Sequence, residues 1–291
     1  MLQMNGSQPE VTIVYLTKNG GDDFRRSLEA IFAQHSDVPF EVLVVDSGSV
    51  DRTVELASIR GARVVRLAPN SFNYGATKNL AAQQAKGKIL VFLSQDNIPA
   101  SDEWLTLLVE PFSAGAKVVQ GPALSESHGF YWWRCGGFFF TSETRRWLQK
   151  FPVGLSSCNL AIRKDILQLV PFRAVPMNED KVLQRDLRAA GFEAMVVPNA
   201  PVLHTHVYGP RDLALRLENE GLGWRYADVQ YSLLDAFFDI LSPRMWGRAW
   251  SGLLNGEIRR VHEFLFPLLR PLMVYKGVHF TKIYRWEREA S

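Results

Sequence analysis

The stretch "KILVFLSQDNIP", residues 88–99, ends an apolar run in a set of polar residues. Its first part, "KILVFLS", is typical of a strand buried on both faces. Asp96 follows at once, flanked by Gln95 and Asn97. A buried strand therefore carries a lone carboxylate at its C-terminal end, and this arrangement is informative about both the fold and the function.

The chain before this strand alternates short apolar runs with amphipathic segments. Alternating strands and helices predict an α/β fold with a doubly wound, mainly parallel sheet. In such sheets ligands bind beyond the C-terminal ends of the strands. The polar groups expected there are Thr17-Lys18-Asn19, Asp46-Ser47 and Ser94-Gln95-Asp96-Asn97. Strands are predicted at 11–17, 40–48, 62–67 and 88–94, and helices at 23–34, 51–61 and 75–87.

The middle of the chain, roughly residues 112–160, is less regular. The segment "HGFYWWRCGGFFF", residues 128–140, concentrates aromatic residues and glycines, and two interpretations stay open. It is either strand and core material, or an aromatic-lined acceptor groove or mobile loop. A helix is predicted at 178–191, with Glu179 and Asp180 in its first turn, and a strand at 192–198.

Composition narrows the class of protein. The chain has 291 residues, which suits one large domain with an appendage, and its formal net charge of +3 is too small to indicate a nucleic-acid partner. Two cysteines fit a reducing compartment rather than a disulfide framework. No signal peptide is expected in "MLQMNGSQPE", and no apolar run of membrane-spanning length is present in the sequence.

The tail, residues 226–291, interleaves apolar and aromatic residues with arginines and lysines, and Pro267 and Pro271 interrupt its most apolar piece. We expect a helical, basic and apolar extension. It packs on the catalytic domain or on a second subunit, or it lies on an anionic membrane, and these interpretations do not exclude one another.

The chemistry follows from the strand ends. A carboxylate such as Asp96 can hold a divalent cation, and the cation can hold a diphosphate. Asp46 could accept hydrogen bonds from a base or ribose, although either aspartate alone is also typical of an exposed turn. Neither GxxxxGK[ST] nor GxGxxG occurs, which argues against P-loop phosphotransferases and dinucleotide-dependent dehydrogenases.

Four segments in the same order resemble the inverting family 2 glycosyltransferases, whose fold is known as GT-A. These are "VTIVYLTKN", "VVDSGSVDRT", "FNYGATKNLAAQQAKGKILVFLSQDNIP" and "MNEDKVLQRDLRAAGFEAMVVPNAPVLHTH". The details "FNYGATKN", "FLSQDNIP" and "HTHVYG" favour the rhamnosyltransferase-like branch. The resemblance covers about residues 10–225 and implies a GT-A domain at 9–225, followed by the extension at 226–291.

The resemblance also implies roles for individual residues. Asp96 matches the metal-binding aspartate of the family's DxD motif, while Ser94 stands where the first aspartate is usual. Asp180, second of the Glu179-Asp180 pair, matches the general base. His204 is implied as a further ligand for Mg²⁺ or Mn²⁺, with His206 as the alternative. The contacts implied to the nucleotide sugar are Thr17, Asn19, Asp46, Asn73, Lys78, Asn79, Gln95 and Asp96.

The resulting hypothesis is a metal-dependent inverting glycosyltransferase in the cytoplasm or at the inner face of the membrane. A dTDP- or UDP-sugar, with dTDP-rhamnose favoured, would give its sugar to a glycan or lipid-linked acceptor, and a homo-oligomer is compatible with the tail. Ser94 supports one alternative, a nucleotide-sugar-binding protein that has kept the fold and lost the chemistry. A membrane-recruited assembly factor is another.

Overall fold

The computed structural model describes residues 8–283, and the predictions about residues 1–7 and 284–291, Arg285 included, lie outside them. The chain forms two compact units. Among the described residues, unit 1 comprises 8–124, 155–174 and 180–204, and unit 2 comprises 125–154, 175–179 and 205–283. Packing thus assigns 125–154 to the same unit as the tail, and the domain boundary after residue 225 stays a prediction.

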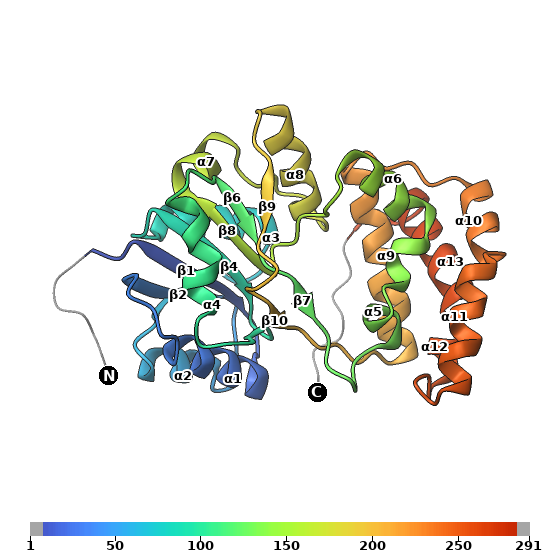
Figure 1. The fold of residues 1–291 in the computed structure, drawn as a ribbon, viewed down its shortest axis with the longest axis horizontal. Coiled ribbons are helices and arrows are strands. Elements are labelled where there is room, and N and C mark those ends of the chain that lie inside the picture. The colour runs from blue at the N-terminus through green and yellow to red at the C-terminus, as the bar shows by residue number, and fades with distance from the viewer. Residues whose placement is uncertain (1–7, 284–291) are drawn as a thin grey trace. The chain divides into compact units, whose positions relative to one another are not determined.

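Unit 1 is built on a seven-stranded sheet with the order β3-β2-β1-β4-β8-β6-β9 (Figure 1). All strand pairs are parallel except those made by β8, which runs antiparallel to both β4 and β6. The predicted mainly parallel sheet is therefore present, and the reversed strand follows the segment that the sequence left irregular. The strands are β1 (Val11–Thr17), β2 (Phe40–Asp46), β3 (Arg63–Arg66), β4 (Ile89–Ser94), β6 (Val118–Gln120), β8 (Asn159–Arg163) and β9 (Ala194–Val196).

Helices cover both faces of this sheet. Alternate residues of β1 point to opposite faces, so that Ile13 joins one buried cluster and Val14 the other. The first cluster takes in residues of α1, α2 and α4, and the second takes in residues of α3, α7 and α8. This double burial explains the continuous apolar runs of the sequence. The helices are α1 (Gly21–Phe32), α2 (Thr53–Ile59), α3 (Tyr74–Gln84), α4 (Trp104–Val109), η1 (Glu110–Phe112), α7 (Lys164–Leu169) and α8 (Glu179–Ala189).

A second, small sheet has the order β5-β10-β7, and its first strand, β5, follows the polar end of β4 in the chain. It consists of β5 (Ile98–Pro99), β10 (Val202–Leu203) and β7 (Ala123–Leu124). Leu203 pairs with Ile98 across two antiparallel strands. The residue after β10, His204, is thereby brought to Asp96, which comes shortly before β5.

Unit 2 is helical and encloses an aromatic core. Phe130, Tyr131, Trp132 and Phe138 are buried, so most of the aromatic segment is core material, as one of the two interpretations had it, in helices rather than strands. The helices are α5 (Tyr131–Arg134), η2 (Gly137–Phe140), α6 (Ser142–Lys150), α9 (Pro210–Tyr226), α10 (Leu233–Ile240), α11 (Pro243–Leu254), α12 (Val261–Phe264) and α13 (Phe266–His279).

The helices α9 and α13 pack closely through glycines. A Cβ atom on Gly277 would lie 2.0 Å from the carbonyl oxygen of Glu218, so only glycine fits there. Pro271 lies inside α13, which continues to His279, so Pro271 does not interrupt the segment as predicted, whereas Pro267 stands in the first turn of α13, just after the break between α12 and α13. Within residues 8–283, no helix combines the length and apolar character needed to cross a membrane.

Candidate active site

The carboxyl ends of β1, β2 and β4 meet at one edge of the sheet in unit 1. The strand register sets Thr17 beside Asp46 and Leu16 beside Ser94. Thr17 Oγ1 donates a hydrogen bond of 3.1 Å to Asp46 Oδ1. The polar groups predicted to meet a ligand at this edge are therefore neighbours, although they bond mainly to one another and to the adjoining backbone.

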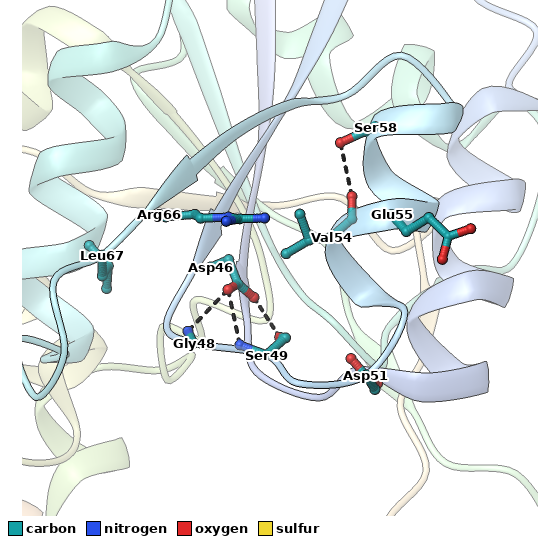
Figure 2. A pocket seen from close by; sticks show the side chains of 9 residues that line it. All are labelled: Asp46, Gly48, Ser49, Asp51, Val54, Glu55, Ser58, Arg66 and Leu67. Atoms are coloured by element: carbon teal, nitrogen blue, oxygen red, sulfur yellow. Dashed lines mark hydrogen bonds between the residues drawn. The ribbon is translucent and has the colours of Figure 1, made fainter.

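Asp46 builds the turn that follows β2. Its Oδ2 accepts from the backbone N–H groups of Gly48 and Ser49, both at 3.0 Å, and its Oδ1 accepts from the hydroxyls of Thr17 and Ser49. Figure 2 shows three of these bonds. Two carboxylate oxygens offer about four lone-pair positions. All four are thus engaged by the protein, and a contact from Asp46 to a base or ribose would replace one of these bonds.

A cavity of about 550 Å³ opens beside this turn. Arg66, at the end of β3, extends its exposed guanidinium over the cavity close to Asp46 (Figure 2). The volume falls within the usual range for small-ligand sites. Arg66 was not expected from the sequence, because a charged residue at the end of an edge strand is ordinary. The lining residues are Asp46, Gly48, Ser49, Asp51, Val54, Glu55, Ser58, Arg66 and Leu67.

Two predicted ligand contacts instead join loops. Gln95 Oε1 accepts from the backbone N–H of Lys18 at 3.0 Å, and its Nε2 donates to the backbone oxygen of Lys18 at 3.2 Å. Asn19 Oδ1 accepts from the N–H of Val50 at 2.8 Å. The loops after β1, β2 and β4 are therefore linked to one another by side-chain amides.

The predicted contacts on α3 are also engaged within the protein. Asn73 caps the helix by accepting from the N–H of Ala76 at 3.0 Å. Asn79 makes two hydrogen bonds with the backbone of Phe172, at 2.8 and 3.1 Å. Lys78 is buried, and its ammonium lies 5.3 Å from the centre of the Phe172 ring. The geometry favours structural roles for Asn73 and Asn79, while the nucleotide contacts assigned to all three stay predictions.

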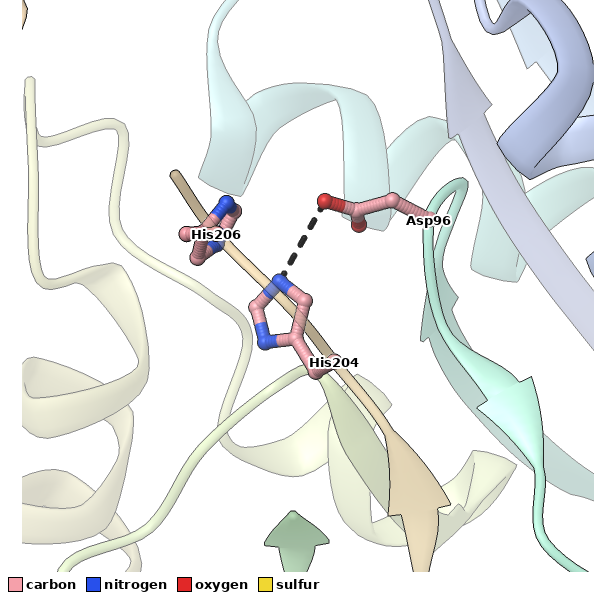
Figure 3. A group of neighbouring side chains, drawn as sticks. All are labelled: Asp96, His204 and His206. Carbon is pink, nitrogen blue, oxygen red and sulfur yellow. Dashed lines mark ion pairs between the residues drawn. The ribbon is translucent and has the colours of Figure 1, made fainter. Parts of the chain in front are cut away.

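Asp96 and His204 form the polar pair at the end of β4. The Nε2 atom of His204 lies 3.3 Å from Asp96 Oδ2 (Figure 3). Burial alone would lower the pKa of His204, but Cys158 and Asp96 outweigh burial and raise it above its ordinary value. Figure 3 also draws His206, which follows two residues later and belongs to unit 2. A carboxylate oxygen and an imidazole nitrogen this close can share one cation.

Cys158 contacts His204 of this pair, and it was not expected from the sequence. Leu93 pairs with Asn159 across antiparallel strands, so Cys158 comes opposite Ser94. Burial raises the pKa of a thiol, but His204 and two serine hydroxyls outweigh burial and lower the pKa of Cys158 to about 7. Only the reversed direction of β8 brings these residues together, and no local pattern in the sequence signals that reversal.

Asp180 reaches the same surroundings from α8. Its Oδ2 accepts from the backbone N–H of Ser157 at 3.3 Å, and its Oδ1 accepts from the N–H of Lys181 at 2.7 Å. Cys158, the next residue after Ser157, contacts His204. The short segment 157–158 therefore connects the predicted base to the predicted metal ligands. Glu179, which belongs to unit 2, is buried.

The sequence model described as "Glycosyl transferase family 2" matches residues 12–170 of this chain. The match covers more than half of the chain, and it includes β1, β2 and β4 with their polar ends.

The chain belongs to glycosyl transferase family 2.

Similar curated proteins agree with the predicted branch. The chain is 27% identical over 227 residues to the O-antigen chain rhamnosyltransferase RfbN of Salmonella typhimurium, covering 73% of this chain and 72% of that protein. It is 25% identical over 229 residues to the O-antigen chain rhamnosyltransferase WbaN of Salmonella anatum, covering 74% and 72%. The resemblance to the rhamnosyltransferase-like branch of family 2 is thereby confirmed.

Solved structures confirm the fold. The mannosyltransferase PcManGT of Pyrobaculum calidifontis, solved with GDP-Man and Mn²⁺, aligns with a TM-score of 0.62 at 15% identity, covering 95% of this chain and 89% of that one. Glucosyl-3-phosphoglycerate synthase of Mycobacterium tuberculosis aligns with a TM-score of 0.57 at 19% identity, covering 77% and 82%. The chain has the GT-A fold, and with its family this makes it a nucleotide-sugar glycosyltransferase.

Proposed function

We propose that this protein is a cytoplasmic, metal-dependent inverting transferase that moves rhamnose from dTDP-rhamnose to a hydroxyl of a polysaccharide or lipid-linked oligosaccharide. The observation that carries the proposal is the Asp96–His204 pair, joined through residues 157–158 to Asp180 at the carboxyl edge of the sheet. The donor and acceptor class rest on the two relatives, which are named as O-antigen chain rhamnosyltransferases.

Asp96 and His204 would hold the divalent cation. They offer one carboxylate oxygen and one imidazole nitrogen 3.3 Å apart, and both side chains are partly exposed. This donor set fits a cation, and the imidazole favours Mn²⁺ over Mg²⁺, which prefers oxygen ligands. When bound, the cation neutralises charge on the departing diphosphate. Mn²⁺ is also named with the two solved transferases above.

Asp180 would act as the general base. In an inverting transfer, a base takes the proton of the acceptor hydroxyl as the oxygen attacks the anomeric carbon. The carboxylate lies in the first turn of α8, where the N-terminal end of the helix dipole attracts negative charge. Its two backbone hydrogen bonds fix its orientation.

The cavity beside Asp46 would receive part of the nucleotide. Arg66 supplies a positive group there that can face a phosphate or a polar edge of the base. The turn at Asp46–Ser49 is already held by four hydrogen bonds, so little ordering is needed on binding.

Turnover of a panel of dTDP- and UDP-sugars tests the base. We expect Asp180→Asn to slow transfer by about 100-fold or more while donor affinity is retained. Asp186→Asn is the matched control, because Asp186 lies on the same helix and pairs with Arg173. Equal rates for Asp180→Asn and the wild type would overturn the assignment.

Calorimetry tests the metal separately from turnover. Asp96→Asn should abolish the Mn²⁺-dependent part of donor binding, and chelation by EDTA should reduce wild-type donor affinity to the same level. Full activity in the presence of EDTA would contradict the proposed role of Asp96.

A further inference from the structure

The helix α10 in unit 2 is oriented with its apolar side chains outward. Its exposed side chains, together with the residue after it, are Leu233, Leu234, Phe237, Phe238 and Leu241, here called the apolar stripe. Spacings of one, four, five and eight residues place all of them on one face of a helix. Phe238 and Leu234 are 65% and 68% exposed. A helix of a soluble protein normally buries such a face.

The opposite face of α10 is polar and turned inward. Asp239 is buried and accepts from the N–H and hydroxyl of Ser142, both at 2.8 Å, and from the hydroxyl of Tyr231 at 2.9 Å. Asp235 accepts from both terminal nitrogens of Arg146, at 2.9 and 2.6 Å. These bonds fix the rotation of the helix, so the apolar stripe cannot turn toward the core.

The exposed charges of the chain from the stripe to residue 283 are mainly basic, although Lys276 pairs with Glu218 at 2.8 Å and Arg260 with Glu263 at 3.6 Å. Arg244 lies three residues after Leu241, which limits the separation of their Cα atoms to about 10 Å. Among the described residues from 233 to 283, the one exposed acid is Glu257, which pairs with Arg134 at 3.4 Å. The exposed lysines and arginines in this range are Arg244, Arg248, Arg259, Arg260, Lys276 and Lys282.

The neighbouring helix α11 continues the pattern. It begins two residues after α10 closes at Leu241, and the two helices follow one another along one edge of unit 2 in Figure 1. Trp250, Leu253 and Leu254 are exposed on it, and tryptophan is favoured where an apolar phase meets water. Exposed apolar residues thus alternate along the chain with the arginines.

We propose that the apolar stripe and its flanking arginines bind an anionic lipid surface. Apolar side chains would enter the boundary between headgroups and acyl chains, while the arginines would face the lipid phosphates. Charge complementarity favours this occupant over a second copy of the chain. Two copies meeting through this face would bring like charges together, whereas anionic headgroups neutralise them.

Vesicle flotation of the full chain tests the proposal. The protein should float with vesicles of phosphatidylcholine mixed with phosphatidylglycerol and much less with phosphatidylcholine alone, and high salt should weaken the binding. Leu234→Glu combined with Phe238→Glu should reduce binding by about 100-fold or more. Leu169→Glu on α7 of unit 1 is the matched control, because Leu169 is 66% exposed, and it should bind as the wild type does.

A milder variant separates charge from the apolar contact. Arg244→Gln should reduce binding to the anionic vesicles by about fivefold, since a basic residue near such a surface contributes about that factor. Circular dichroism and the melting temperature show whether each variant is folded. If the double variant unfolds, the binding of Arg244→Gln and the salt dependence of the wild type still test the proposal.

Three outcomes would overturn the proposal. One is a wild-type protein that floats with neither vesicle, and another is a folded double variant that binds vesicles as well as the wild type does. The third is a wild-type dimer in light scattering that the double variant converts to monomers, with no vesicle binding by either. That result would make the stripe an interface between two copies of the chain. None of these readouts depends on sugar transfer.

Discussion

In unit 1, the loops at the carboxyl edge of the sheet hold their polar side chains against one another at the surface. In unit 2, an arginine and several acids lie inside, and leucines and phenylalanines lie outside. The exposed apolar residues of unit 1, such as Ile59 and Leu169, are on separate helices, whereas those of α10 share one face. Unit 1 thus has a cavity beside its polar strand ends, whereas unit 2 has an exposed apolar face on α10 that buried polar contacts hold in place.

The largest expected effect comes from removing the central buried charge of unit 2. Arg270 is fully buried and bonds to Glu143 at 2.7 Å and to both carboxylate oxygens of Glu220, at 2.9 and 2.8 Å. Arg270→Met would leave two acids without their partner and should lower the free energy of unfolding by about 3–5 kcal/mol, measured by urea denaturation. Arg211→Met, on the exposed start of α9, should change it by less than about 0.5 kcal/mol.

A triple variant sharpens this prediction. Adding Glu143→Gln and Glu220→Gln to Arg270→Met removes the uncompensated charges and should restore part of the lost stability. A loss below about 1 kcal/mol in the single variant would mean that the buried acids bind protons instead.

An intermediate effect is expected where α10 is anchored. The hydrogen bonds from Arg146 lower the pKa of Asp235 to about 2, below its ordinary value. A lowered folded-state pKa stabilises the fold above the unfolded value near 4, and that stabilisation is lost as the pH falls toward 2. Asp235→Asn should therefore lower the free energy of unfolding by about 2 kcal/mol at pH 7.

The pH dependence provides the check on this variant. Urea denaturation at several pH values should show the difference between Asp235→Asn and the wild type shrinking from pH 5 downward. A difference that stays constant between pH 7 and pH 3.5 would contradict the assigned ion pair.

The smallest effect is expected in the loops of unit 1. Gln95→Ala removes both hydrogen bonds to the backbone of Lys18 and should lower the free energy of unfolding by about 1 kcal/mol, with a few-fold rise in the KM for the donor. Gln83→Ala on α3 alters an exposed side chain and is the control. If KM rises by orders of magnitude while stability is unchanged, Gln95 contacts the donor directly, as the family resemblance implied.

The sheet of unit 1 could be predicted because each parallel strand is buried on both faces. "VTIVYLT" occupies β1 over its full length, and α3, the helix before β4, falls where its pattern places it. β8 could not be predicted from such a pattern. Its five residues follow an irregular segment, and the reversal of its direction depends on the strands at its sides.

The residues of the candidate site also differ in whether the sequence could predict them. Asp96, Asp180 and His204 stand in segments that resemble the family, so the sequence was sufficient to select them. Cys158 and Arg66 reach the site through strand pairing and through the end of an edge strand, which are properties of the folded chain. Unit 2 has no comparable motif. The apolar spacing of α10 is the same as that of a helix that faces a core, so only the structure shows that this face is exposed.

The turn closed by Asp46 has a consequence for how such an enzyme can change during evolution. Its shape is maintained by bonds inside the protein, while Arg66 faces the adjoining cavity from another strand. Substitution at Arg66 would therefore change the charge and shape of the proposed nucleotide cavity without dismantling the turn.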